Sequence, residues 1–315
     1  MITINNSILR ASVFIAILLS FVCSYNLASA QDTDWQKMLN EGETPKKELV
    51  TATFKTTRII NAQTIETVKK RTLDFRVTHR FGAIGAASGG DKHTLYGFDV
   101  SSDIRIGFEY GITDRLTLGF ARCKRKENLQ GLVKFKLLQQ TKDNKMPFSA
   151  TVYSDMAFTP EKDIDSAYVK WEHRLTYTTQ LILARKFSSH VSLQLMPTYV
   201  HRNYVSYFDD ENDLISIGAG GRIKLTKRSA VIFDYYYTLS DFRKKANSSD
   251  FFYVKQKYYA PLGLGWEVET GGHVFSIMLT NSSGIIEGDY IPNTTDNWLR
   301  GGFRFSFNIS RNFRI

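Results

Sequence analysis

The chain has 315 residues, 43% of them hydrophobic and 13% aromatic, and a formal net charge of +10. Its two cysteines, Cys23 and Cys123, allow neither a disulfide framework nor a cysteine metal site, and the positive charge is scattered rather than clustered. Nucleic acid is therefore not an expected partner, and no metal or other cofactor is predicted.

The first thirty residues have the pattern of a cleavable signal peptide. Arg10 supplies a positive charge, residues 11–23 are an apolar run, and Ala28-Ser29-Ala30 places small residues at the cleavage site. A membrane anchor would need roughly twenty apolar residues. A lipoprotein cleaved before Cys23 is another alternative, but Val22 stands where a small residue is expected. We expect residues 1–30 to be removed on export.

Residues 31–71 form a polar N-terminal segment. Residues 31–48 are typical of a linker, with at most one short helix, whereas residues 50–70 are rich in Thr, Ile and Val without regular alternation. Three places remain open for residues 50–70: a plug inside a barrel, a periplasmic segment, or an added strand.

From Thr72 onward one pattern recurs to the end of the chain. Leu73, Phe75 and Val77 alternate with Asp74 and Arg76, so this segment is a strand with one apolar and one charged face. Similar stretches follow at intervals, each bounded by turn residues. The apolar positions of the twelve stretches span residues 73–81, 104–110, 116–120, 133–137, 148–158, 175–183, 191–199, 215–225, 231–239, 258–268, 275–279 and 299–309.

The connections between these stretches alternate in length, as in a membrane barrel with short periplasmic turns and longer external loops. Both termini would then lie at the periplasmic side. After Cys23 no apolar run reaches eighteen residues, which excludes helical membrane spans. The long connections lie near residues 82–102, 124–131, 159–172, 203–214, 240–257 and 281–298, and the short ones near 111–115, 141–146, 188–190, 226–229 and 270–272.

These features predict an all-β fold: an antiparallel up-and-down transmembrane β-barrel of about twelve strands over residues 72–315. Closing the sheet removes its edges and satisfies every backbone group in lipid. A soluble lipocalin-like barrel or a sandwich would instead bury the aromatic side chains inside. Most of the stretches are long enough to cross a bilayer, and Tyr110, Tyr199 and Trp298 lie near strand ends, where a membrane interface favours them. Outer-membrane lipid is the expected partner.

The chain also resembles a known family. The stretches Ala52–Asn61, Leu73–Gly82, Tyr110–Arg115, Leu183–Phe187 and Leu195–Tyr199 are similar to an uncharacterised outer-membrane β-barrel family of Bacteroidota. The resemblance implies an outer-membrane location; the family is a domain of unknown function, so no catalytic residue carries over. The last strand is also similar to the aromatic-ended strand that barrel-assembly machinery reads, although here Phe313 precedes the terminal Ile315 by two positions.

The charged face of the strands should line the lumen. On this face about thirteen basic side chains oppose about eight acidic ones, which predicts a weak preference for anions if the pore conducts. Twelve strands fall between small barrels filled by side chains and large barrels with aqueous pores, so a channel for small solutes and a closed, non-conducting lumen both remain open. The main expected pore-lining residues are Asp74, Arg76, Arg80, Arg105, Glu109, Arg174, Lys186, Arg222, Lys224, Asp234, Glu267, Arg300 and Arg304.

Two alternative functions remain open beside a channel. A membrane-embedded lipid hydrolase would need a serine beside a histidine, and His79, His173, His201 and His273 fall on the apolar face with no such serine beside them. No catalytic residue is therefore predicted. A surface-binding barrel could hold divalent cations with the acidic loop 209–213, although a solvated loop explains that run as well.

Overall fold

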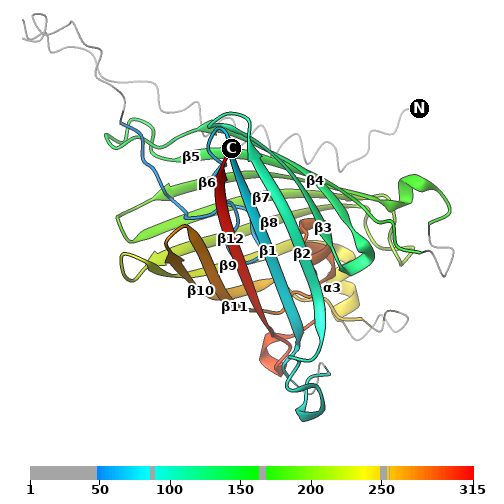
Figure 1. Cartoon of the computed structure of the whole chain (residues 1–315). Coiled ribbons are helices and arrows are strands. Elements are labelled where there is room, and N and C mark those ends of the chain that lie inside the picture. The colour runs from blue at the N-terminus through cyan, green and yellow to red at the C-terminus, as the bar shows by residue number, and fades with distance from the viewer. Residues whose placement is uncertain (1–47, 86–88, 163–167, 249–253, 255) are drawn as a thin grey trace, which may run out of the picture. The chain divides into compact units, whose positions relative to one another are not determined.

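The computed structural model describes residues 48–85, 89–162, 168–248, 254 and 256–315. The expected signal peptide and residues 31–47 lie outside this part of the chain. The described residues contain twelve antiparallel strands that close into a single barrel, in which β1 pairs with both β2 and β12 (Figure 1). The predicted fold class is confirmed.

Each strand pairs with its sequence neighbours, so the barrel is an up-and-down meander. The strands are β1 (Thr72–Ala83), β2 (Ser101–Gly111), β3 (Leu116–Cys123), β4 (Leu129–Leu138), β5 (Ser149–Phe158), β6 (Leu175–Lys186), β7 (Val191–Arg202), β8 (Asp213–Lys224), β9 (Ser229–Leu239), β10 (Leu262–Thr270), β11 (His273–Thr280) and β12 (Arg304–Arg314).

The alternation in sequence becomes the two faces of the wall. In β2, Ile106 and Phe108 are 45% and 43% exposed, whereas Arg105 between the apolar positions is 0% exposed. Phe108 lies opposite Phe75 of β1 on the outer surface, with ring centroids 5.1 Å apart. The apolar face therefore points outward and the charged face inward, as expected for a barrel whose exterior meets lipid.

The two rims differ in the length of most of their connections. The expected alternation fails at one pair, because the β4–β5 connection (139–148) has ten residues and the β3–β4 connection (124–128) has five. Short turns join β2 to β3, β6 to β7, β8 to β9 and β10 to β11, and β1 begins and β12 ends at the same rim, which we call the short-turn rim. The opposite long-loop rim carries the short helices η2 (Lys92–Thr94), η3 (Arg125–Glu127), η4 (Trp171–Arg174), α3 (Asp241–Asn247), α4 (Glu287–Asn293) and η5 (Trp298–Arg300). Among the described residues, no helix has the length and apolarity to cross a membrane.

Two expected strands begin later than the alternation indicated. β10 starts at Leu262, so Tyr258 lies in the preceding loop. β12 starts at Arg304, because the chain first makes the 3-10 turn η5. The Asn297 side chain accepts a hydrogen bond from the Leu299 amide, and Gly301 adopts a left-handed φ of 73°, a conformation that favours glycine.

Candidate functional site

The lumen of the barrel is occupied by a hairpin formed by residues 53–66, which we call the lumen hairpin. It enters from the short-turn rim, where the Val50 amide donates to the Gln140 carbonyl at 2.8 Å. The hairpin turns at its tip, where the Ile59 amide donates to the Ala62 carbonyl at 2.9 Å, and it returns to the same rim at Arg71. Every residue from 57 to 65 is buried.

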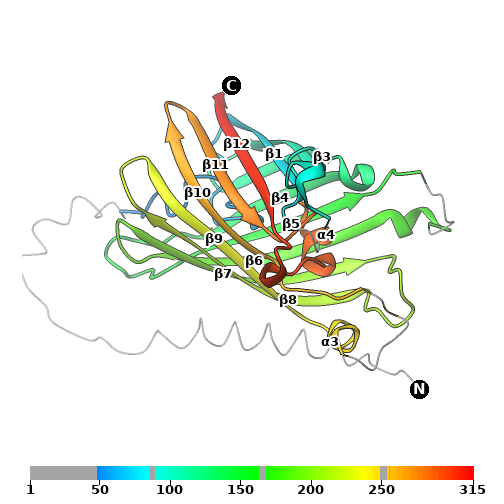
Figure 2. The same cartoon turned by 90° about the horizontal axis from the view of Figure 1, so that it is seen from below.

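A second insert enters from the long-loop rim. Residues 281–303 fold inward between β11 and β12 and carry α4 into the ring of strands (Figure 2). Asp289 of α4 lies 2.7 Å from the Arg125 guanidinium of η3 and also faces Lys126. Burial would raise the pKa of the Asp289 carboxyl, but the two cations outweigh it and hold that pKa below its usual value.

The two inserts meet in the middle of the lumen. Arg58 of the hairpin forms an ion pair with Glu287 of α4 at 2.8 Å, and both side chains are fully buried. Arg58 also donates to the Ile285 carbonyl, while Gln63 and Tyr153 donate to Glu287 at 3.0 and 3.1 Å. The passage is closed at this level, and the closure depends on a buried charge pair between elements from opposite rims.

One side of the hairpin packs against an apolar part of the inner wall. Gly220 and Gly263 leave room for its tip: a β-carbon at Gly220 would lie 2.9 Å from the Ile59 side chain, and one at Gly263 would lie 2.6 Å from that of Ile60. The buried apolar cluster comprises Phe54, Ile59, Ile60, Ala62 and Ile65 of the hairpin, Leu132, Tyr153, Ile182, Ala184, Met196, Val200, Leu214, Ile232, Tyr236 and Met278 of the wall, and Tyr290 and Ile291 of α4.

The hairpin tip is also held by a single wall carboxylate. Asp234 of β9 accepts hydrogen bonds from the Asn61 and Ala62 amides at 2.6 and 2.8 Å and from the Asn61 side chain at 2.9 Å. These three hydrogen bonds use most of the roughly four acceptor sites of a carboxylate. Asp234 was expected to line a pore; here it anchors the hairpin.

Cationic side chains of the wall reach the hairpin from other strands. Arg76 donates to the Arg58 carbonyl at 2.9 Å, and Lys134 donates to the Thr57 carbonyl at 2.5 Å. Arg80 bonds the side-chain oxygen of Asn61 and also the carbonyls of Ser282 and Gly284, so it contacts both inserts. Lys186 donates to the carbonyls of Thr51 and Ala52 at the short-turn rim.

The structure places most of the expected pore-lining residues on the inner wall. Arg222 and Glu267 form an ion pair there at 2.8 Å, Arg76 pairs with Asp74 at 3.1 Å, and Arg304 pairs with Asp296. Arg174 and Arg300 instead lie in η4 and η5, outside the strands, and Arg174 donates to the carbonyls of Thr159 and Glu161 in its own loop. The residues on inward-facing strand positions are Asp74, Arg76, Arg80, Arg105, Glu109, Lys186, Arg222, Lys224, Asp234, Glu267 and Arg304.

Sequence reasoning missed the residues that close the lumen. Arg58 and Glu287 lie outside the strands, and Lys134 was not among the main expected residues. One signal was available: Ile182, Met196, Ile232 and Tyr236 are apolar residues at inward positions, where they interrupt the alternation. Apolar side chains facing a lumen indicate that something apolar fills it.

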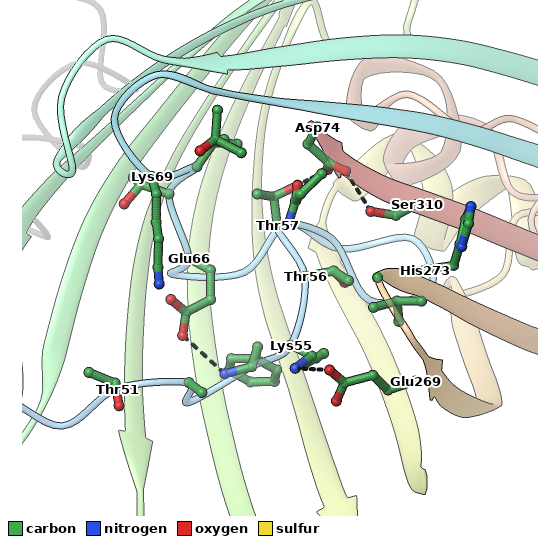
Figure 3. Close-up of a pocket in the computed structure, with 18 residues that line it drawn as sticks. Thr51, Lys55, Thr56, Thr57, Glu66, Lys69, Asp74, Glu269, His273 and Ser310 are labelled. Carbon is green, nitrogen blue, oxygen red and sulfur yellow. Dashed lines mark hydrogen bonds and ion pairs between the residues drawn. The ribbon is translucent and has the colours of Figure 1, made fainter. Parts of the chain in front are cut away.

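A cavity of about 580 Å³ lies at the short-turn rim between the lumen hairpin and the wall (Figure 3). Lys55 of the hairpin pairs with Glu269 at 2.6 Å on one side of it, and Ser310 donates to Asp74 at 2.5 Å on another. Its lining is rich in hydroxyl and charged groups, including Thr51, Thr56, Thr57, Glu66, Lys69 and His273 (Figure 3). The hairpin therefore fills the lumen tightly on one side and leaves polar space on the other.

The acidic loop 209–213 is engaged by protein side chains. Asp210 pairs with Arg202 and Arg243, each at 2.9 Å, and Glu211 accepts a hydrogen bond from Ser240. These contacts tie the β7–β8 loop to α3. Within the part of the chain that the structure describes, no group of three or more His, Cys, Asp or Glu side chains could hold a metal ion.

The comparison with known families assigns the chain. Residues 54–313 match a membrane-bound β-barrel domain family (DUF5777). The chain belongs to this family. The match begins at Phe54, inside the lumen hairpin, and so includes most of the hairpin with the barrel. No curated protein matches the chain.

Solved structures share the barrel fold at low sequence identity. The NanC porin is 10% identical with a TM-score of 0.45, covering 77% of this chain and all of that one. The KdgM porin is 7% identical with a TM-score of 0.43, and the match covers 78% of this chain and 99% of the porin. An outer membrane channel (COG4313) from Pseudomonas putida F1 is 12% identical with a TM-score of 0.44, and the match covers 79% of this chain and 98% of the channel. By its family match and its closed strand ladder, this chain is a membrane-bound β-barrel.

Proposed function

We propose that this protein is an outer-membrane channel for small solutes and that the structure is its closed state, with the lumen hairpin as the movable element. The observation that carries the proposal is the way the hairpin is attached. It enters and leaves at one rim, and the described backbone hydrogen bonds between this segment and the wall lie at that rim, near Val50 and Arg71. Its tip is held by side chains and by apolar packing.

Withdrawing such a hairpin leaves the barrel intact. The strand ladder is complete without it, so no wall hydrogen bond is broken in lipid, where an unpaired backbone group costs several kcal/mol. The exposed lumen would carry more cations than carboxylates, which supports a preference for anions. Its inward cations include Arg76, Arg80, Arg105, Lys134, Lys136, Lys186, Arg202, Arg222, Lys224 and Arg304, and its inward carboxylates include Asp74, Asp103, Glu109, Asp155, Asp234, Glu267 and Glu269.

The proposal includes the orientation and the biogenesis of the barrel. The short-turn rim faces the periplasm with both termini, and the signal peptide 1–30 and the periplasmic residues 31–47 precede the hairpin. Barrel-assembly machinery inserts the chain through its aromatic last strand. We also propose a Bacteroidota origin, which the resemblance of the sequence supports.

A disulfide across the hairpin tip tests the proposal. The β-carbon of Ile60 and a β-carbon built at Gly263 lie 3.1 Å apart, near the separation of roughly 3.5–4.5 Å that a disulfide needs. Ile60→Cys with Gly263→Cys, in a Cys123→Ser background, should give no channel openings in planar bilayers when oxidised. Openings should appear on reduction, with a reversal potential that indicates anion preference.

The controls distinguish closure by the disulfide from a loss of conductance that the substitutions themselves cause. Cys123→Ser alone and each single cysteine variant should conduct with or without reductant. Equal conductance of the oxidised and reduced double variant would refute a movable hairpin, and the absence of openings in every form would refute a channel.

A non-conducting structural barrel is the second candidate, favoured by the apolar cluster around the hairpin and by the buried Arg58–Glu287 pair. We propose no catalytic role. The Ser189 hydroxyl lies 2.9 Å from the His190 ring, but this pair sits in an exposed turn, and the described contacts of His190 include no carboxylate to orient it.

A further inference from the structure

The wall cations that touch the lumen hairpin share an unusual kind of partner. Three of them, Arg80, Lys134 and Lys186, form no ion pair within 4.0 Å among the described residues, and their bonds go to neutral oxygens of the two inserts. Arg76 has one carboxylate partner, Asp74, and a hairpin carbonyl. The direct hydrogen bonds of these side chains thus go mainly to carbonyl and amide oxygens.

The four cations form an array along the lumen. Arg80 lies toward the long-loop end of β1, and Arg76 lies four residues nearer the short-turn rim. Lys134 projects from the middle of β4, where it donates to three hairpin carbonyls, those of Thr57, Thr64 and Glu66. Lys186 ends β6 at the short-turn rim.

Neutral oxygens are weaker partners for a cation than anionic ones. An anionic acceptor adds a direct Coulomb attraction to the charge-assisted bond that a cation already makes with a neutral oxygen, and arginine in particular matches the two oxygens of a carboxylate or phosphate. A small anion that reached these side chains would replace a neutral acceptor by a charged one at each position. The hairpin oxygens therefore occupy positions that suit an anion better.

We propose that Arg76, Arg80, Lys134 and Lys186 form a binding array for small carboxylate- or phosphate-bearing solutes, which open the channel by taking these cations from the lumen hairpin. The inference rests on the proposed function, because it names the solute class and the trigger of the same movement. In the closed state the hairpin oxygens bind these cations in place of the solute, and the solute displaces them when the channel opens.

The cavity at the short-turn rim gives a solute access to this array. Its lining includes Thr51 and Ala52, whose carbonyls bind Lys186, and Thr57 and Glu66, whose carbonyls bind Lys134 (Figure 3). A solute in the cavity thus lies beside the bonds that it must replace. Asp74, Glu66 and Glu269 also line the cavity, and each is paired with a cation: Arg76, Lys136 and Lys55, respectively.

The test follows the exposure of the hairpin tip. Ala62 is fully buried, so a thiol at Ala62→Cys, in a Cys123→Ser background of the full chain, reacts with a water-soluble maleimide only when the hairpin leaves its site. Replacing sodium chloride by sodium phosphate at constant ionic strength should raise the labelling rate about tenfold, the factor that corresponds to about 1.4 kcal/mol of added attraction from an anionic acceptor. Glucose at the same concentration should leave the rate unchanged.

Variants separate anion binding from hairpin stability. Arg80→Gln and Lys134→Gln should label faster without phosphate, because the hairpin loses a bond, but their rates should no longer rise with phosphate. Arg222→Gln is the matched control: Arg222 is also an inward cation, but it pairs with Glu267 of the wall, so the phosphate response should remain. A merely structural role for Arg80 and Lys134 would change the baseline and keep the response.

Two results would overturn the inference: a labelling rate that is independent of phosphate, or a phosphate response that survives in both Arg80→Gln and Lys134→Gln. The proposed function fails separately, in bilayer recordings of the Ile60→Cys and Gly263→Cys lock. If the reduced double variant conducts but thiol labelling does not respond to phosphate, the protein is a channel that another trigger opens. If labelling responds to phosphate but no variant conducts, the protein is a barrel that binds anions without conducting.

Discussion

At the scale of single residues, the closed lumen depends on one buried ion pair. Arg58 and Glu287 are 2.8 Å apart with no solvent exposure, so each would be left as an isolated buried charge if the other were removed. Breaking a buried pair in this way costs about 3–5 kcal/mol, whereas replacing both partners by apolar residues is often neutral. The pair therefore determines how the two inserts are positioned against each other. Its net contribution to the free energy of hairpin docking is the smaller effect.

Single and double variants test this reading. Glu287→Leu and Arg58→Leu should each lower the free energy of hairpin docking by about 3 kcal/mol or more. The double variant Arg58→Leu with Glu287→Leu should lie closer to the parent than either single variant. Protection of the Ala62→Cys thiol from labelling measures docking, and additive losses in the double variant would contradict the account.

Glycines of the inner wall supply the second test at this scale. Gly263→Val should displace the hairpin tip, because its β-carbon would meet Ile60 at 2.6 Å and an Asp234 oxygen at 2.8 Å. Overpacking of this kind costs about 1–3 kcal/mol. Gly131→Val is the control, since nothing lies within 4 Å of a β-carbon there. Thiol labelling at Ala62→Cys should rise in the first variant and stay at the parent rate in the second.

At the scale of elements, the sequence predicts the strands, but it leaves three places open for residues 50–70, among them a plug, and it does not predict the insert 281–303. An alternation of two residues identifies a strand and its faces from local sequence alone, and this held for all twelve strands. The lumen hairpin has no such signal: its turn, residues 59–62, lacks the Asn-Gly or Gly-X pair of ordinary hairpins. It is stabilised by contacts with residues more than 170 positions away, such as Asp234 and Glu287.

The helix α4 likewise could not be predicted from its local sequence. Its seven residues include Pro292 and have no side-chain cap, so little in the local sequence favours a helix. Its position is fixed instead by Arg58 from the hairpin and Arg125 from η3. Two adjacent apolar pairs in this loop, Ile285-Ile286 and Tyr290-Ile291, are the sequence signal that the loop is not solvated.

The anchor of α4 has a defined pH dependence. The pKa of Asp289 is lower in the folded state than its usual value of about 3.9, so its stabilisation is present above that value and is lost as the pH falls through the folded pKa. The loop should stay protected from proteolysis between pH 5 and 8, by this reasoning, and loosen only below about pH 4.

The charge can also be removed at neutral pH. Asp289→Asn should make the loop 281–303 sensitive to protease at pH 7, because Arg125 and Lys126 lose their partner. Asp241→Asn, which affects an exposed pair with Lys244, is the matched control and should leave the loop protected. Equal cleavage of the two variants would show that the Asp289 charge does not anchor α4.

At the scale of the whole molecule, the barrel and the content of its lumen are set by different information. Twelve amphipathic stretches leave few alternatives to closure, so the architecture follows from the pattern. The lumen is filled by segments that the pattern does not describe, and their positions depend on long-range contacts. Arg174 and Arg300 show where the pattern fails. Both continue the inward positions of the alternation, but they lie in η4 and η5, before the next strand of the wall begins.

The account depends most on the division between an apolar exterior and a polar interior, and cysteine labelling along β12 tests it directly. Phe305→Cys and Phe307→Cys should react with a thiol reagent confined to the bilayer, while Ser306→Cys and Asn308→Cys, on the alternate face, should be protected. The reverse pattern, with positions 306 and 308 labelled and 305 and 307 protected, would turn the barrel inside out and contradict the account.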